Sequence, residues 1–532
     1  MNAKVPKDSQ TGQIRFWGSP EADLFTLEIA ASFQGVLTRN MITDPTDPMV
    51  GFVSASIDGR PWTDTMWTRD AGVFLRELVL WGDLEHACLV AGCLMALVQG
   101  NDEGYTTFPM YFQRGQTGSG SELDGTCAIV IGFVLLWERL AETHPMRVKI
   151  TDFLNGPASP LAYILHRLER HPLIPGSGEF GGGLGIEGDF YNVVQNHLVR
   201  LALLLAARMA RWMGHLAQAE VYSTAAEKIS DGMLRYLRGA DGGWLWAINA
   251  GRLQPDPAVI DNIYNKGAGG LNGVLSMWPD GLGLTPLESN WAGIEPCLKT
   301  FSGLLNTPKR QAMFEKYGIW TQFDDLWEGY MTSPSYGHSY ATQAMLLTDK
   351  LEMAGKAVDF LARMTYQPFP GNKLDRESPY YFYERSYLPE LMEAWLSQDN
   401  QRGKQPEWIA NGFDGQNFDQ GCGALNLVNV AEPLKIARLI LGVDDSNPAE
   451  VRLIPRLPPT WQGMEAENWP ILTSKGLIHA SIRCERSAGN IHLVIKVIHG
   501  EAIPALAVRL FSAKGYTWKR AENVFALEEY NS

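Results

Sequence analysis

Two carboxylates lie on a glycine-rich stretch at residues 183–190 (GLGIEGDF), directly before a long segment with helical periodicity. Apolar residues recur there at spacings of three to four, from Val193 to Trp212, which predicts an amphipathic helix. Packing requires no acid on such a loop, whereas cleavage of a glycosidic bond requires acids held at the mouth of a cavity. We therefore interpret Glu187 as a candidate general acid.

The second acid of this stretch, Asp189, has two interpretations. It stands close to the expected start of the helix, where an aspartate often caps the first turn. It could equally accept hydrogen bonds from a bound ligand, so we retain Asp189 as a candidate substrate-binding residue. Glu187 stands two residues further from the helix, where capping explains it less well.

Two further motifs place acids at expected helix starts. Residues 61–70 (PWTDTMWTRD) bring together Trp67, Arg69 and Asp70, and residues 121–126 (SELDGT) contain Asp124. Capping is the alternative explanation for either aspartate. It leaves the neighbouring Trp67 and Arg69 unexplained, whereas a sugar site uses a ring that stacks and a guanidinium that hydrogen-bonds hydroxyls. We expect Trp67, Arg69, Asp70 and Asp124 to bind substrate.

A second catalytic carboxylate is expected late in the chain. An inverting mechanism needs a base roughly 6.5–9.5 Å from the acid. Glu384, in an aromatic run at 380–385 (YYFYER), and Glu407, in 406–412 (PEWIANG), are the two candidates. An ion pair with Arg385 is the structural alternative for Glu384. The residues alone leave the choice between Glu384 and Glu407 open.

Composition excludes several other classes of function. The net charge of −14 argues against nucleic acid or an anionic membrane as partner. It gives no information about a neutral sugar. The ten histidines are dispersed without a metal-ligand pattern, and phosphate loops and dinucleotide fingerprints are missing, so we expect no metal and no cofactor. Six scattered cysteines and a polar start favour reduced thiols and a cytoplasmic protein. The oligomeric state is left open.

The elements that must position these residues are mostly helices. Short turns at Gly82 and Gly214 alternate with long loops rich in Gly, Trp and acid, which is typical of helical hairpins arranged as an (α/α)6 toroid with one functional face. After Gly442 the pattern changes to short alternating runs, which predicts a small C-terminal antiparallel β-sandwich. We predict a mainly α protein with a helical domain at 1–442 and a sandwich domain at 443–532. Helices are expected at 20–37, 70–81, 83–99, 121–143, 158–171, 189–213, 215–238, 287–303, 338–350, 352–366, 386–397 and 420–441.

The order of these motifs resembles the six-hairpin glycosidases, the clan of (α/α)6-barrel hydrolases that includes glucoamylases, processing α-glucosidases and α-L-rhamnosidases. The segments 67–70 (WTRD) and 122–125 (ELDG) are similar to sugar-binding motifs of that clan, and the Glu187 loop is similar to the position of its general acid. The junction at 437–444 and 451–458 resembles the one between the last helix and the sandwich in α-L-rhamnosidases. Because helical periodicity begins near residue 20, we expect this sequence to lack the large N-terminal β-domain of many of these enzymes.

These observations lead to three hypotheses. The first is an inverting, exo-acting glycoside hydrolase that removes a terminal sugar, with Glu187 as acid and Glu384 or Glu407 as base. The second is a polysaccharide lyase or sugar epimerase on the same toroid, which would use Tyr336, His338 or Tyr340 as a proton shuttle. The third is a non-catalytic carbohydrate-binding protein in which the acids only cap helices.

Overall fold

The computed structural model describes most of the first half of the chain and most of its C-terminal part. The described residues are 11–57, 62–101, 103–176, 190–245, 247–251, 253, 295–296, 299, 311–312, 315, 331–332, 338–347, 350–365, 386–387, 427–487, 490–501, 503, 505–512, 515–521 and 526–528. Every structural statement below concerns these residues.

The outer helices begin at residues that are good helix starts. Helix α1 (Pro20–Gly35) is capped by Ser19, and α6 (Pro160–Arg170) by Ser159, each with proline at the first helical position. Capping side chains also start α3 (Leu84–Leu97) and α5 (Pro145–Asn155). Helix α8 (Leu216–Tyr236) is amphipathic and buries one face. Helix α15 (Leu351–Thr365) completes the described outer helices.

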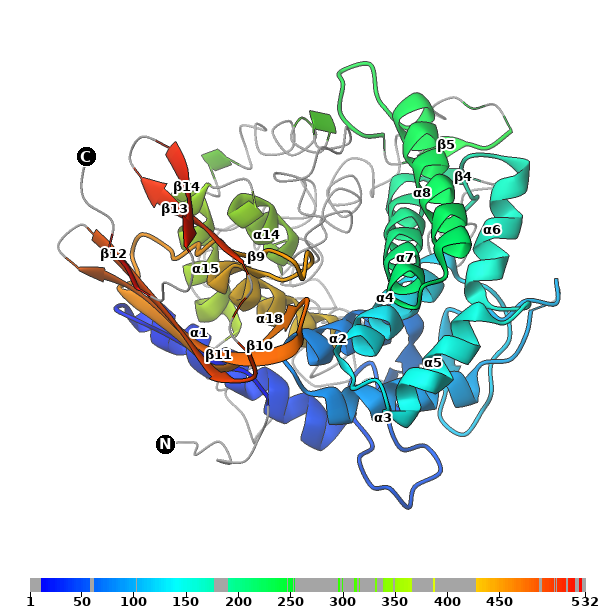
Figure 1. The fold of residues 1–532 in the computed structure, drawn as a ribbon, viewed down its shortest axis with the longest axis horizontal. Helices are drawn as coiled ribbons and strands as arrows, with labels where there is room; N and C mark the ends of the chain where they lie inside the picture. Colours follow the sequence, from blue (N-terminus) through cyan, green and yellow to red (C-terminus); the bar gives the residue numbers. More distant parts are fainter. Residues whose placement is uncertain are drawn as a thin grey trace, which may run out of the picture.

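The inner helices are buried around most of their circumference. They are α2 (Thr68–Leu80), α4 (Leu123–Arg139), α7 (Val193–Trp212), α14 (Tyr340–Leu347) and α18 (Leu427–Leu441). Every residue of α4 is buried, which is the burial expected of a helix enclosed by neighbours. Helix α2 packs on α4, α4 on α7, α14 on α18, and α18 on α2. Figure 1 shows these five helices following an arc, with α1, α3, α5, α6, α8 and α15 outside them.

Two glycines close the hairpins between an inner and an outer helix. Gly82 follows α2 and Gly214 follows α7, and their φ angles are 86° and 77°. Only glycine adopts this left-handed conformation without a steric cost, so each turn ends one helix and starts the next within a few residues. The predicted short turns at both positions are confirmed.

Short strands connect the long loops at the other end of the helices. Strand β2 (Thr65–Trp67) pairs antiparallel with β3 (Tyr111–Gln113), and β4 (Phe190–Asn192) with β5 (Ala247–Asn249). Strand β6 (Met331–Thr332) pairs in the same way with β7 (Ser386–Tyr387). In each case two of the long Gly- and Trp-rich loops are joined. Strands β2 and β4 run directly into the inner helices α2 and α7, so each pair fixes where an inner helix begins.

The C-terminal part forms two sheets. The first has the order β1-β10-β11-β12-β15 and is antiparallel throughout; the second has the order β14-β13-β9-β8, in which β9 and β13 run parallel. The bounds are β1 (Gln13–Trp17), β8 (Val443–Asp444), β9 (Val451–Leu453), β10 (Gly463–Thr473), β11 (Gly476–Ser487), β12 (Asn490–His499), β13 (Leu506–Ser512), β14 (Gly515–Ala521) and β15 (Ala526–Glu528). In Figure 1 the two sheets lie beside α1, α15 and α18.

Three details differ from the sequence expectations. Strand β1 pairs with β10, so residues 13–17 contribute to the C-terminal sheet although the boundary at 442 assigned them to the helical part. Helix α5 was not expected between the helices predicted at 121–143 and 158–171. The helix predicted at 386–397 is wrong at its first two residues, because Ser386 and Tyr387 form β7; its remainder and most of the helix predicted at 287–303 lie outside the described residues.

Candidate functional site

The predicted binding residues of the first half meet at the start of two inner helices. Arg69 and Asp70 are in the first turn of α2, and Asp124 is in the first turn of α4. Arg69 Nη1 donates to Asp124 Oδ2 at 3.2 Å, and Arg69 Nε lies 3.5 Å from Asp70 Oδ1. The structure thus brings together three of the residues predicted to bind substrate.

Neither aspartate occupies the N-cap position. The N-cap of α2 is Trp67 and that of α4 is Glu122, and neither makes a capping hydrogen bond through its side chain. For α7 the N-cap is Asn192, whose Oδ1 accepts from the Gln195 backbone N–H at 2.8 Å. Asp70 and Asp124 are therefore not N-cap residues, although both lie in the first turn of a helix, where the helix dipole favours an acid.

A glycine allows the two helix starts to approach each other. A Cβ atom on Gly125 would lie 2.2 Å from Thr68 Oγ1, so the motif ELDG needs glycine at this position for steric reasons. Thr68 Oγ1 also donates to the Pro109 carbonyl at 2.6 Å, which holds the preceding loop against α2. Since Thr68 precedes Arg69 and Gly125 follows Asp124, this close contact places the ion-pairing side chains next to each other.

Exposure differs sharply within the cluster. The side chain of Asp124 is completely buried, whereas Asp70 and Arg69 keep 8% and 15% of their side-chain surface exposed. A ligand can therefore reach Arg69 and Asp70 more readily than Asp124. The hydrogen bond from Arg69 to the buried Asp124 fixes one end of the guanidinium.

An aromatic pair borders the cluster. Trp67 and Tyr111 are directly opposite each other in the β2–β3 pair, and their ring centroids are 5.6 Å apart at an interplanar angle of 48°. Tyr111 is 44% exposed, because β3 alternates exposed and buried side chains. Flat, partly exposed rings of this kind can pack on the C–H faces of a sugar. The sequence reasoning identified Trp67 but missed Tyr111.

The third inner helix contributes two residues that the sequence reasoning also missed. Gln195 Nε2 donates to Asp124 Oδ1 at 3.3 Å, and Asn192 Nδ2 donates to Gln195 Oε1 at 2.9 Å. Both side chains are buried. The signal in the sequence is a polar run at 195–197 (QNH) on an otherwise apolar helix, because buried polar groups are placed to satisfy specific partners.

The remaining predicted site residues, Glu187, Asp189, Glu384 and Glu407, lie outside the described residues. Among the described residues, no group of three or more His, Cys, Asp or Glu side chains could hold a metal ion.

His338, a residue of the alternative hypothesis, has a core position. Its side chain is fully buried, its ring packs edge-on against Phe360, and its Nε2–H donates to the Ala357 carbonyl at 2.7 Å. Burial lowers the pKa of His338 to about 4, so the ring is neutral at pH 7. A ring without solvent access and with Nε2 bonded to the backbone is poorly suited to shuttle protons.

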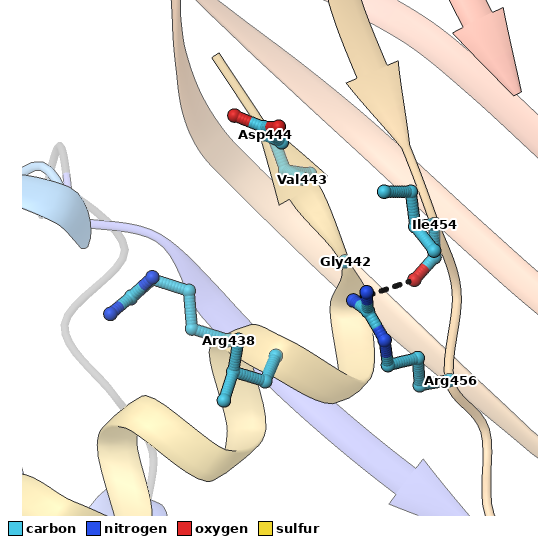
Figure 2. Close-up of a pocket in the computed structure, with 7 residues that line it drawn as sticks. Arg438, Gly442, Val443, Asp444, Ile454 and Arg456 are labelled. Carbon is cyan, nitrogen blue, oxygen red and sulfur yellow. Dashed lines mark hydrogen bonds between the residues drawn. The ribbon is translucent and has the colours of Figure 1, made fainter. Parts of the chain in front are cut away.

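A small pocket lies at the opposite end of α18 from the loops that precede the inner helices. Figure 2 shows it at the junction between α18 and strands β8 and β9, with Arg438, Asp444 and Arg456 among its lining residues. Gly442 has φ of 76°, and a Cβ there would meet the Ile454 carbonyl oxygen at 1.8 Å, so the junction requires glycine. This pocket joins the helices to the sandwich and contains none of the predicted site residues.

Comparison with known proteins supports the fold. No protein-family model and no curated protein sequence matches the chain. Among solved structures, it is similar to the α-L-rhamnosidase from Dictyoglumus thermophilum, with a TM-score of 0.51 and 9% identity over 96% of this chain and 49% of that one. It is also similar to the GH78 family rhamnosidase of Bacillus sp. GL1, with a TM-score of 0.51 and 15% identity over 92% of this chain and 42% of that one.

These similarities establish the fold class. The chain is a mainly α protein with an (α/α)6-toroid fold and a small C-terminal β-sandwich, as predicted. It spans half or less of the length of the two rhamnosidases that it matches. None of the helices that the structure describes is long and apolar enough to cross a membrane.

Proposed function

We propose that the protein is an inverting, exo-acting glycoside hydrolase that removes a terminal sugar from an oligosaccharide or glycoside. The observation that carries the proposal is the Arg69–Asp70–Asp124 cluster at the starts of α2 and α4, bordered by Trp67. Its groups suit a polyhydroxylated ligand, because the guanidinium donates to hydroxyls, the carboxylate accepts from them, and the indole packs on the sugar ring.

In this proposal Glu187 is the general acid that protonates the leaving oxygen. Glu384 or Glu407, as a carboxylate, activates a water molecule on the opposite face of the sugar ring. Arg69 and Asp70 hold the terminal sugar, supported by Asp124. Asp189, on the same loop as the acid, is proposed as a further binding residue. The reaction needs no metal or other cofactor, since two carboxylates supply both proton transfers.

The sugar itself is left open, including whether it is anionic. The two structural neighbours are named as rhamnosidases, and at 9% and 15% identity they are informative about the fold alone. We propose L-rhamnose and D-glucose as the first terminal sugars to probe. Of the three proton shuttles considered for the lyase or epimerase hypothesis, His338 is buried in the core, which makes it a poor shuttle. Tyr336 and the side chain of Tyr340 lie outside the described part of the chain.

The test is a substitution series on the proposed catalytic carboxylates. Glu187→Gln should lower the turnover of aryl glycosides by at least ~100-fold while the protein stays folded, which is the usual size of general acid catalysis. Glu384→Gln and Glu407→Gln measured in parallel should identify the base as the variant with the larger loss. A Glu187→Gln variant with near wild-type turnover would contradict the assignment of the acid.

A further inference from the structure

The start of α7 carries more buried polar groups than capping requires. Asn192, Gln195, Asn196 and His197 are all completely or almost completely buried. The role of Asn196 is clear, since its Nδ2 donates to the Ile174 carbonyl at 3.0 Å and its Oδ1 accepts from the Ile174 N–H at 2.8 Å. Asn192 caps the helix. The side-chain amide of Gln195 serves neither purpose.

The amide of Gln195 is oriented by Asn192. Asn192 Nδ2 donates to Gln195 Oε1 at 2.9 Å, so the other end of the amide, the Nε2 group, faces Asp124 Oδ1 at 3.3 Å. This orientation is the only productive one, because a carboxylate can accept from an amide N–H but cannot donate to an amide oxygen. Asn192 thereby sets the direction of Gln195.

Asp124 is held between two inner helices by these contacts. Its Oδ1 accepts from Gln195 of α7 and its Oδ2 accepts from Arg69 of α2. A carboxylate that is fully buried keeps its position and its charge only if hydrogen bonds compensate for the lost water. Through Asp124, the position of the Arg69 guanidinium is therefore linked to Gln195, a side chain of α7.

We propose that Gln195 is a positioning residue for sugar binding: it fixes Asp124, and through Asp124 it fixes Arg69. This inference rests on the proposed glycosidase function, since the sugar is the ligand that Arg69 would hold. It also connects the binding cluster to the helix that follows the Glu187 loop in the sequence. The orientation of Arg69 matters, because a misplacement of about 1 Å loses much of the advantage of a preorganised site.

The first test is Gln195→Leu, which keeps the approximate volume and removes the amide. The matched control is Gln218→Leu on the outer helix α8, where Gln218 Nε2 donates to Asn155 Oδ1 at 3.0 Å and to Tyr222 Oη at 2.8 Å. With 4-nitrophenyl α-L-rhamnoside and 4-nitrophenyl α-D-glucoside as probes, Gln195→Leu should raise KM roughly 10- to 100-fold, the range for losing a hydrogen bond to a charged group. Its kcat should change much less, and Gln218→Leu should change neither constant.

The second test is Gln195→Glu, which has nearly the same shape and separates positioning from folding. The new carboxyl faces the carboxylate of Asp124, and the like charge raises its pKa. While protonated it donates to Asp124 as the amide does; once ionised it repels Asp124. The ratio of kcat/KM between variant and wild type should therefore fall as pH rises through that pKa. A purely structural role would give a ratio that is independent of pH while the protein remains folded.

The outcomes separate this inference from the proposed function. The positioning role alone would be overturned by two results together, provided that wild type turns over a probe. The first is an equal KM for Gln195→Leu and Gln218→Leu. The second is a ratio of kcat/KM between Gln195→Glu and wild type that does not change with pH. If wild type hydrolyses neither probe, calorimetric titration with L-rhamnose and D-glucose replaces the kinetics. If Gln195→Leu weakens sugar binding and Gln218→Leu preserves it, the result supports the inference without hydrolysis. If wild type binds neither sugar, both the inference and the proposed function are overturned.

Discussion

At the scale of single residues, the motifs pointed to Arg69, Asp70 and Asp124, which the structure brings together, but not to the side chains that hold them. These three residues stand out in the sequence because an aromatic residue, a basic residue and acids gather at the starts of expected helices. Gln195 and Asn192 do not stand out, because an amide at each position also fits a capping pattern. The hydrogen bond between Gln195 and Asp124 joins residues 71 positions apart, which sequence spacing cannot reveal.

His338 gives a prediction about pH and stability. Its pKa in the folded protein is about 4, below the ordinary value of 6.5. The unfolded chain therefore binds more protons between these values, so the contribution of His338 to stability is complete above about pH 6.5 and decreases as pH falls toward 4. His338→Gln can still donate to the Ala357 carbonyl but cannot take up a proton.

The free energy of unfolding of wild type should decrease between pH 7 and pH 4 by on the order of 3 kcal/mol more than that of His338→Gln. Urea unfolding at a series of pH values measures this difference. The control is the exposed His215→Gln, which should leave the wild-type slope in place. If the free energy of unfolding changes with pH in the same way for wild type and His338→Gln, then His338 is not responsible for the loss of stability at low pH.

At the scale of elements, apolar periodicity was a reliable guide to the helices with a continuous apolar face. Helices α2, α3, α4, α7, α8 and α15 lie within a few residues of their predicted ranges. Helix α5 was missed because it buries only Ile150 and Leu154, so its periodic signal is weak, and it begins with a proline that also suggests a turn. The parallel pairing of β9 with β13 joins distant segments and leaves no local signal.

Helices α2 and α18 are joined by a buried ion pair that gives an element-scale prediction. Arg438 Nη2 and Nε donate to the two carboxylate oxygens of Glu77 at 2.9 and 3.1 Å, and both side chains are nearly inaccessible. Arg438→Met should lower the free energy of unfolding by ~3–5 kcal/mol, because it leaves the Glu77 charge buried without its bidentate partner.

The double variant Glu77→Leu/Arg438→Met should recover part of that loss, since it removes both charges. Lys475→Met is a matched control, because Lys475 pairs with Glu501 at 2.8 Å on the surface and should cost less than ~1 kcal/mol. Chemical denaturation of the four proteins makes the comparison. A loss for Arg438→Met as small as that of Lys475→Met would mean that the buried pair does not stabilise the packing of α2 on α18.

At the scale of the whole molecule, the starts of the inner helices and the paired long loops lie at one end, and the junction with the sandwich lies at the other. The strand pairs β2–β3 and β4–β5 fix the starts of α2 and α7, which contribute Arg69, Asp70 and Gln195 to the proposed binding cluster. Arg139 joins the far end of α4 to Asp445, whose Oδ2 also accepts from the Leu472 N–H of the sandwich at 2.8 Å. The alternation of long and short loops in the sequence predicted that the long loops would gather at one end of the helices.

The central claim, inverting hydrolysis of a terminal glycoside, is tested most directly by the anomeric configuration of the first product. Proton NMR during hydrolysis of 4-nitrophenyl α-L-rhamnoside and 4-nitrophenyl α-D-glucoside by wild type resolves the released anomer before it equilibrates. We predict the β-anomer as the first product from whichever α-glycoside is cleaved, because water attacks the face opposite the leaving group. Release of the α-anomer would contradict the inverting mechanism, and formation of an unsaturated product would contradict hydrolysis itself.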